Sequence, residues 1–203
     1  MGTAADAIGK LEHDQDVYIL TFGQFSLIDA LCAILEQTGA ADVVLSSWTA
    51  ADAHLEKTAG LIESSEITSL RMILDRSFET RQPAYCYHMR ELFGTDCIRH
   101  VRSHCKFMLI KNAEWNIVIR TSMNLNENPR LENIEITDNK EFYSFFDIIV
   151  KDIFSEVAPG ESRSKRLNIE SIQEDLPFRE IKAQIIPQKS LKIPKTTHTI
   201  KKL

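Results

Sequence analysis

The sequence predicts an α/β protein whose mixed β-sheet is sandwiched by helices. Three observations predict it. Short β-prone apolar runs alternate with segments of helical spacing, two central runs are joined by a polar link typical of a hairpin, and hydrophobic residues make up 43% of the chain. For 203 residues we expect one domain over residues 15–158, an N-terminal arm over 1–14, and a basic, weakly ordered C-terminal tail over 159–203.

The first part of the chain has the pattern strand, helix, strand. Residues 17–22 form a short apolar run that predicts a buried strand. Residues 27–35 place leucine and isoleucine at helical spacing, with Gly39 as a C-cap. Residues 42–47 form a second β-prone run, so this segment predicts a right-handed crossover between a parallel pair of strands.

The next segment is expected to be mostly helical. Residues 50–63 and 66–79 predict two helices, the second because its apolar side chains fall on one helical face. Pro83 is expected to end that pattern. Residues 84–88 then predict a short strand, and residues 90–93 a turn of helix before Gly94.

The second half is expected to begin with a β-hairpin. Residues 105–110 and 117–121 are β-prone, and the polar link between them contains turn residues. Opposed residues in this hairpin should sum to about 227, which puts Lys106 opposite Thr121. Residues 134–136 could add an edge strand, and residues 142–154 carry an apolar stripe that predicts a helix closing near Pro159.

Charge is distributed unevenly along the chain. The net charge is −5, but residues 182–203 hold six lysines and no acidic residue, which leaves −11 for residues 1–181. A basic tail on an acidic body favours a polyanionic partner, although such a tail can also be simply solvated. There is no apolar stretch of ~20 residues and no secretory signal pattern, so we expect a cytoplasmic protein without stable membrane association. The four cysteines are expected to be reduced thiols.

Four polar side chains around the expected hairpin could form a phosphate-binding site. His104 and Lys106 are two residues apart and should project from one sheet face, with Ser122 and Asn124 just beyond the paired end. A neutral imidazole can attack phosphorus, while the ammonium, hydroxyl and amide can bind its non-bridging oxygens. A second imidazole is then needed to protonate the leaving oxygen.

The same residues carry a family resemblance. The string His104-Cys105-Lys106, then Ser122-x-Asn124, then Glu132-Asn133, resembles the phospholipase D superfamily motif His-x-Lys-x(4)-Asp, Gly-Ser-x-Asn and a later Glu-Asn. The resemblance covers about residues 15–157. It implies a phospholipase D-like fold and a phosphodiesterase, with His104, Lys106, Asn124 and Glu132 as catalytic residues and Glu132 orienting the nucleophilic histidine. It implies no metal and no cofactor.

The motif occurs once in this chain, as in the bacterial endonuclease-like type. The resemblance therefore implies a metal-independent nuclease that works as a homodimer through a phosphohistidine intermediate, with nucleic acid as the substrate. Two alternatives stay open, a catalytically inactive nucleic-acid-binding module and a phospholipid-processing enzyme. Lys111 stands where the motif has Asp, and Thr121 where it has Gly. We expect Lys111 to reverse a charge near the site.

Other residues allow weaker interpretations. A cluster with zinc-ligand chemistry does not match common zinc spacings, and it comprises Cys86, His88, Cys97, His100, His104 and Cys105. We expect Cys105 to be a buried, inert thiol. Several arginines could line a groove for a phosphate backbone or be solvated, namely Arg71, Arg76, Arg81, Arg90, Arg99 and Arg102. Trp48 and Trp115 could be core or turn residues, or could stack on bases.

Overall fold

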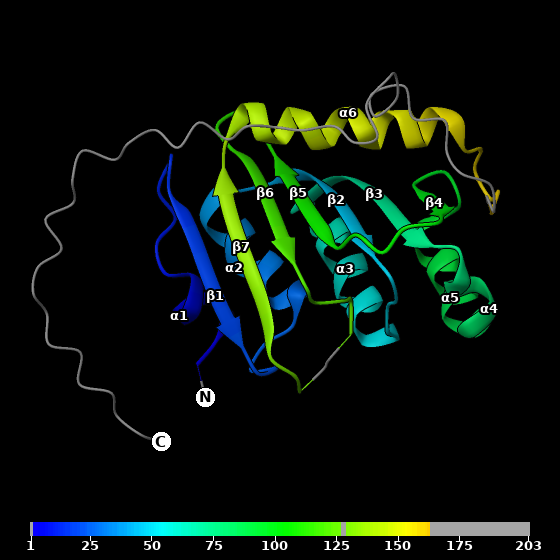
Figure 1. Ribbon diagram of the computed structural model, residues 1–203, viewed down its shortest axis with the longest axis horizontal. Helices are drawn as coiled ribbons and strands as arrows, with labels where there is room; N and C mark the ends of the chain where they lie inside the picture. Colours follow the sequence, from blue (N-terminus) through cyan, green and yellow to red (C-terminus); the bar gives the residue numbers. More distant parts are fainter. Residues whose placement is uncertain (1, 127–128, 163–203) are drawn as a thin grey trace, which may run out of the picture.

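The computed structural model describes residues 2–126 and 129–162 (Figure 1). Most of the expected basic tail, including its lysine-rich end and an expected helical turn around 168–175, lies outside the described residues. None of the helices in the described ranges is long and apolar enough to cross a membrane.

The described residues form one seven-stranded mixed sheet in the order β1-β7-β6-β5-β2-β3-β4. Neighbours from β1 to β2 pair antiparallel, whereas β2, β3 and β4 pair in parallel. The strands are β1 (Asp16–Thr21), β2 (Ala41–Ser47), β3 (Ile67–Asp75), β4 (Ile98–Val101), β5 (Phe107–Lys111), β6 (Asn116–Thr121) and β7 (Glu132–Asp138).

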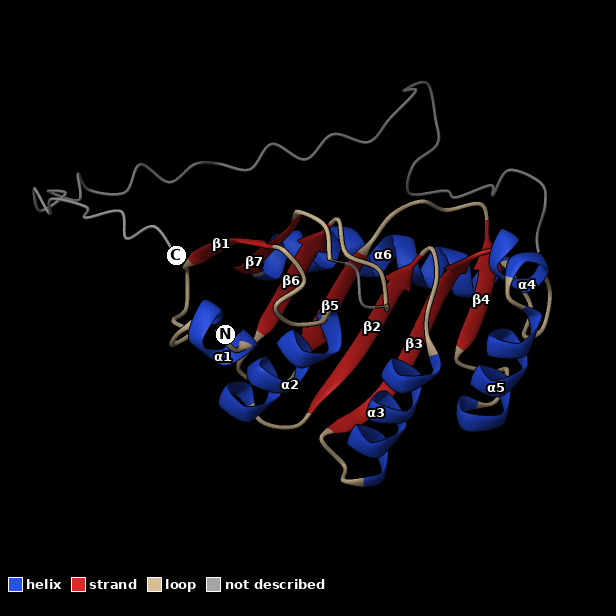
Figure 2. Cartoon of the chain, turned by 90° about the horizontal axis from the view of Figure 1, so that it is seen from below, coloured by secondary structure: helices blue, strands red, loops and turns tan. Residues whose placement is uncertain are grey.

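Helices cover both faces of this sheet, as expected (Figures 1 and 2). α6 packs on one face, and the other helices pack on the opposite face. The helices are α1 (Ala4–Ile8), α2 (Leu27–Thr38), α3 (Asp52–Glu63), α4 (Ser77–Arg81), α5 (Pro83–Phe93) and α6 (Lys140–Glu156). Part of the expected N-terminal arm therefore forms α1, whose Ala4 and Ile8 join the main core.

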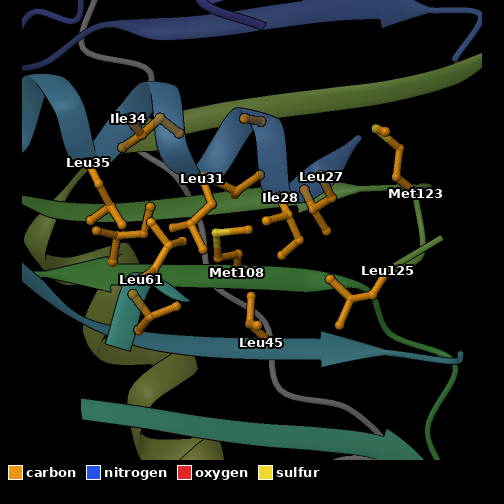
Figure 3. Packing of buried hydrophobic residues seen from close by; sticks show 14 of the residues in the cluster. Leu27, Ile28, Leu31, Ile34, Leu35, Leu45, Leu61, Met108, Met123 and Leu125 are labelled. Carbon is orange, nitrogen blue, oxygen red and sulfur yellow. The ribbon is translucent and has the colours of Figure 1, made fainter. Parts of the chain in front are cut away.

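The larger core lies between the sheet and α2. The buried face of α2 includes Leu27, Ile28 and Leu31, which lie over Leu45 of β2 and Met108 of β5 (Figure 3). A capping box at its N-terminus, in which Ser26 and Asp29 exchange hydrogen bonds, fixes where α2 begins. Burying this apolar stripe is the main stabilising contribution on this face of the sheet.

The expected hairpin is confirmed, including its register. Phe107 of β5 pairs with Arg120 of β6, and Ile110 pairs with Ile117, which is the pairing expected from the sequence. The second expected strand at residues 42–47 and the long helix with the apolar stripe are also present, as β2 and α6.

Two expectations for residues 66–93 were wrong. Residues 67–75 form the strand β3 instead of a helix. This strand lies between β2 and β4, and its consecutive residues Met72, Ile73 and Leu74 are all buried because helices cover both faces of the sheet. Residues 84–88 belong to the helix α5 instead of a strand, whereas the helical turn expected at residues 90–93 is confirmed as the end of this helix. Pro83 starts this helix at its first turn, where no main-chain N–H is needed, so it opens an element where it was expected only to end one.

The expected place of the first strand was also wrong. β1 is an edge strand paired with β7, and its Tyr18 and Leu20 are exposed, so only one of its faces is buried. β1 and β2 run in the same direction but are separated by β7, β6 and β5. β7 was expected to lie at an edge, but it fills the position between β1 and β6. The positions of β1 and β7 depend on pairing between strands that are far apart in the chain, and the local pattern of apolar residues does not indicate which strands pair.

Candidate active site

All five residues predicted for the site lie along one edge of the sheet, namely the edge formed by the strand ends and not by an outer strand. β2 and β6 end at this edge, and β5 and β7 begin there. The segment with His104 and Lys106 precedes β5, Ser122 and Asn124 follow β6, and Glu132 opens β7. Because β5 lies between β6 and β2, the residues that follow both strands flank the start of β5.

His104 and Lys106 were expected to project from the sheet, but they lie in an irregular segment that precedes the strand. β5 begins at Phe107, and Cys105 is exposed, so its expected role as a buried thiol was wrong. Local hydrogen bonds replace the strand ladder here, since the Ser103 hydroxyl accepts from the Cys105 N–H at 3.2 Å. The segment therefore presents His104 to solvent.

Two neighbouring strands hold this segment in place. The Asp75 carboxylate, at the end of β3, accepts a hydrogen bond from the Ser103 N–H at 3.2 Å. The Ser46 hydroxyl, near the end of β2, donates to the Cys105 carbonyl at 3.0 Å. Burial alone would raise the pKa of Asp75, but hydrogen bonds from Ser77 and Ser103 lower it, so this carboxylate stays ionised as an anchor.

Lys106 is half-buried beside the histidine. Its Nζ donates to the His104 carbonyl at 3.2 Å, and its own carbonyl accepts from the Thr121 N–H at 3.3 Å. Burial lowers the pKa of Lys106, and the nearby Cys105 and Glu132 partly oppose that shift. A partly desolvated ammonium gains more from an added anion than a fully hydrated one does.

Ser122 and Glu132 contact each other directly. The Ser122 hydroxyl donates to the Glu132 carboxylate and accepts from the Asn133 N–H at 3.0 Å. Thr121 reinforces this contact, because its hydroxyl donates to the Asn133 carbonyl at 2.6 Å. A glycine at position 121 could not make that bond. The role of Glu132 as the residue that orients His104 stays a prediction.

Asn124 is oriented from the other side. Its Oδ1 accepts from the Trp48 N–H at 3.3 Å, which leaves the amide NH₂ as the donor of this side chain. Met123 and Leu125, the alternating neighbours, are buried in the core (Figure 3). These apolar anchors turn Ser122 and Asn124 away from the core.

Trp48 is a site residue whose place the sequence left open. Its ring lies 5.8 Å from the His104 ring between centroids, and the Arg81 guanidinium carbon lies 3.7 Å from its centroid. Arg81 also donates to the Trp48 carbonyl at 2.9 Å. The sequence feature that could have indicated this role is the position of Trp48 directly after the β-prone run at residues 42–47. Trp115, by contrast, is buried and stacks on His13.

The expectation that Lys111 reverses a charge near the site was wrong. Lys111 is the last residue of β5, at the end of the strand opposite to the site, and its Nζ lies 5.4 Å from the centroid of the Tyr143 ring. Five residues of extended chain separate it from Lys106, or about 16 Å. The departure from the motif at this position therefore leaves the charge at the site unaltered.

The other flanking groups divide between the site and the rest of the fold. Arg71 pairs with Asp147 of α6, Arg90 pairs with Glu79, and Arg99 is buried, so these arginines serve the fold. Of the cluster considered for zinc, the structure brings Cys86 and His100 together. His88 and His104 have other neighbours.

No family model matches the chain, and no curated protein matches it. Among solved structures, NucT from Helicobacter pylori is similar, with a TM-score of 0.54 and 13% identity over 71% of this chain and 99% of NucT. The chain has a phospholipase D-like fold. At this identity the likeness concerns the fold alone.

Two further solved structures are more distant, each with a TM-score of 0.48 and a match over 73% of this chain. Nuc from Salmonella typhimurium, a phospholipase D family member, is 12% identical and is covered over 100% of its length. Polyphosphate kinase from Porphyromonas gingivalis is 16% identical, and the chain spans 27% of it.

Proposed function

We propose that the protein is a metal-independent phosphodiesterase of the phospholipase D-like type, which cleaves nucleic acid as a homodimer. The observation that carries this proposal is the convergence at one sheet edge of an exposed imidazole (His104), a half-buried ammonium (Lys106) and an oriented amide donor (Asn124). This set can bind a phosphodiester and attack it.

The proposed reaction has two steps. The neutral imidazole of His104 attacks phosphorus, so an N–P bond forms while the bond to the leaving oxygen breaks. His104 of the partner subunit supplies a proton to that oxygen and then takes one from water, which attacks phosphorus and releases the histidine. Lys106, Asn124 and Ser122 stabilise the charge that builds on the non-bridging oxygens. Glu132 is the candidate to orient the imidazole.

Nucleic acid is the proposed substrate because of charge. The lysine-rich sequence of residues 182–203 contrasts with the acidic remainder of the chain, and phosphate backbones attract such segments. One observation favours the second candidate, a non-catalytic binding module. The Ser122 hydroxyl donates its hydrogen bond to the Glu132 carboxylate, so it must break that bond before it can donate to a phosphate oxygen.

A cleavage assay in EDTA tests the proposal. Purified protein, a His104→Asn variant and a His88→Asn control are incubated with labelled DNA, labelled RNA and phospholipid vesicles, while light scattering reports the oligomeric state. His88 serves as the control because it pairs with Asp52 and Glu56 on the surface of α5. We expect cleavage of nucleic acid by the wild type and the control, and none by His104→Asn.

Several outcomes would contradict the proposal. Nucleic-acid binding without turnover would favour the binding module, and cleavage confined to vesicles would favour the lipid enzyme. A monomeric particle with full turnover would exclude the shared active site. Mixing the wild type with an excess of His104→Asn adds a further check, because mixed dimers hold a single His104, and a loss of wild-type activity is expected only if both subunits contribute.

A further inference from the structure

Three side chains with metal-ligand chemistry meet at the β4 side of the sheet, and none of them is among the residues of the proposed active site. A carboxylate oxygen of Glu79, the Cys86 thiol and a ring nitrogen of His100 all lie within 4.8 Å of one another. They come from α4, α5 and β4, three elements that are consecutive in the chain. β4 is the third strand along from β5, where the phosphodiesterase residues lie.

The spacing of two of these groups already suits a metal ion. Cys86 Sγ lies 3.7 Å from His100 Nε2. In a tetrahedral zinc site with usual bond lengths, sulfur and nitrogen ligands are separated by about 3.6 Å. The ligand oxygen of Glu79 lies within 4.8 Å of the other two ligand atoms and has to move by at most about 1.3 Å to complete three ligands, because tetrahedral ligand atoms are about 3.5 Å apart.

The burial of the thiol and the imidazole also suits this use. Cys86 is 2% exposed and His100 is 1% exposed. Burial lowers the pKa of His100, which keeps the imidazole neutral and able to ligate. Burial raises the pKa of the Cys86 thiol, and a bound divalent cation would reverse that shift by deprotonating the sulfur.

Glu79 keeps its ionised form although it is partly buried. Burial alone would raise its pKa, but hydrogen bonds from Ser162 and Arg90 lower it. Arg90 donates to Oε1 of this carboxylate. A carboxylate has two oxygens and about four acceptor sites, so Glu79 can ligate a metal while Arg90 remains bound to it. Arg90 would then hold a ligand in place from outside the coordination sphere.

We propose that Glu79, Cys86 and His100 bind a soft divalent transition-metal ion, with Zn²⁺ the best match. A set of one sulfur, one nitrogen and one oxygen ligand disfavours Mg²⁺ and Ca²⁺, which prefer oxygen alone. The ion would fasten α4 and α5 to β4, so its expected role is stability and not phosphodiester chemistry. The competing explanation is a plain thiol–imidazole hydrogen bond in a neutral pocket.

Cobalt titration of the full chain separates these explanations. Protein freed of metal by dialysis against a chelator is titrated with Co²⁺, whose thiolate complexes absorb in the near ultraviolet. We expect one equivalent to bind per chain, Zn²⁺ to displace it, and the melting temperature to rise with metal concentration. Absence of the thiolate band in the wild type would overturn the proposal.

Matched variants assign the ligands. Cys86→Ser should lose the band, whereas Cys97→Ser should keep both the band and the melting shift. Cys97 is the control because its thiol donates to the Phe93 carbonyl and lies outside the three ligands. Glu79→Gln, which keeps size and shape, should weaken Co²⁺ binding at least tenfold even if Cys86→Ser fails to fold. An unchanged affinity in Glu79→Gln, or a band that persists in Cys86→Ser, would contradict the assignment.

Discussion

The two halves of the sheet contribute differently to the proposed active site. The antiparallel half, from β1 to β5, places Lys106, Ser122 and Glu132 at or beside its strand ends. The parallel half, from β2 to β4, contributes supports. Asp75 holds the main chain just before His104, and Trp48 contacts the imidazole. The antiparallel half thus supplies the groups that bind phosphate, His104 lies in the segment that joins β4 to β5, and the positions of these groups depend on the parallel half.

The two lysines of β5 and its flank test most strongly which end of the antiparallel half holds the reactive groups. Lys106→Ala should lower kcat by 10²–10³-fold, because it removes a charged donor at the phosphate, and such donors typically contribute that much. Lys111→Ala, at the other end of the strand, should leave kcat within about threefold of the wild type. Initial rates on labelled DNA at saturating substrate measure both.

Lys111→Asp sharpens the same test, since it restores the residue type of the family motif. Lys111 lies over Tyr143 and pairs across the sheet with Asp42, so the change should act on α6 and on stability. A large gain in activity with unchanged folding would show that position 111 influences the chemistry, against the geometry of β5.

The same division explains what the sequence could predict. The hairpin register follows from two β-prone runs and a short polar link, so Lys106 and the segment with Ser122 and Asn124 could be brought together from local pattern alone. β3 could not be predicted this way. A strand buried on both faces carries consecutive apolar residues such as Met72, Ile73 and Leu74, and this pattern also fits a helix.

The contacts of Trp48 and Asp75 with the site were beyond sequence reasoning for a related reason. Both depend on which strands are neighbours, and the order β5-β2-β3 joins segments that are far apart in the chain. The exposure of Cys105 depended instead on its main-chain hydrogen bonds, since its N–H donates to the Ser103 hydroxyl and its carbonyl accepts from the Ser46 hydroxyl. The strand β5 therefore begins two residues later than the β-prone run suggested.

A core substitution in β3 should produce the next largest effect. Leu74 is 0% exposed, so Leu74→Ala should lower the free energy of unfolding by about 2–5 kcal/mol. Leu20→Ala removes the same atoms from the exposed face of β1 and should cost less than about 0.5 kcal/mol. Urea titration monitored by circular dichroism measures both. Equal losses would contradict the placement of β3 inside the sheet and of β1 at its edge.

Alkaline pH should destabilise the antiparallel half through Tyr143 of α6. Burial raises the pKa of Tyr143 to about 12, and the charge of Asp147 adds to this shift. The folded state therefore holds this proton more tightly than the unfolded state does. The resulting stability is complete below pH ~10 and is lost as the pH rises towards 12, by about 2–3 kcal/mol in all.

Tyr143→Phe should remove most of this pH dependence, because phenylalanine fills the same space without a proton to lose. Tyr87→Phe is the matched control, since Tyr87 is 65% exposed on α5 in the parallel half. Unfolding midpoints in urea between pH 9 and pH 11.5 would decide the point. A slope that is equally steep in Tyr143→Phe and the wild type would assign the alkaline loss to other groups.

Trp48 lies where the two halves meet, because it follows β2, and its expected effect is the smallest. Its ring contacts both His104 and Arg81, so Trp48→Ala should let the imidazole adopt unproductive orientations and lower kcat about tenfold. Trp48→Phe keeps an aromatic face and should restore most of the rate. A positioning role predicts that KM stays nearly constant in both variants. If Trp48→Ala instead raised KM and left kcat unchanged, the indole would be a surface on which a base stacks, and the parallel half would then contact the substrate directly.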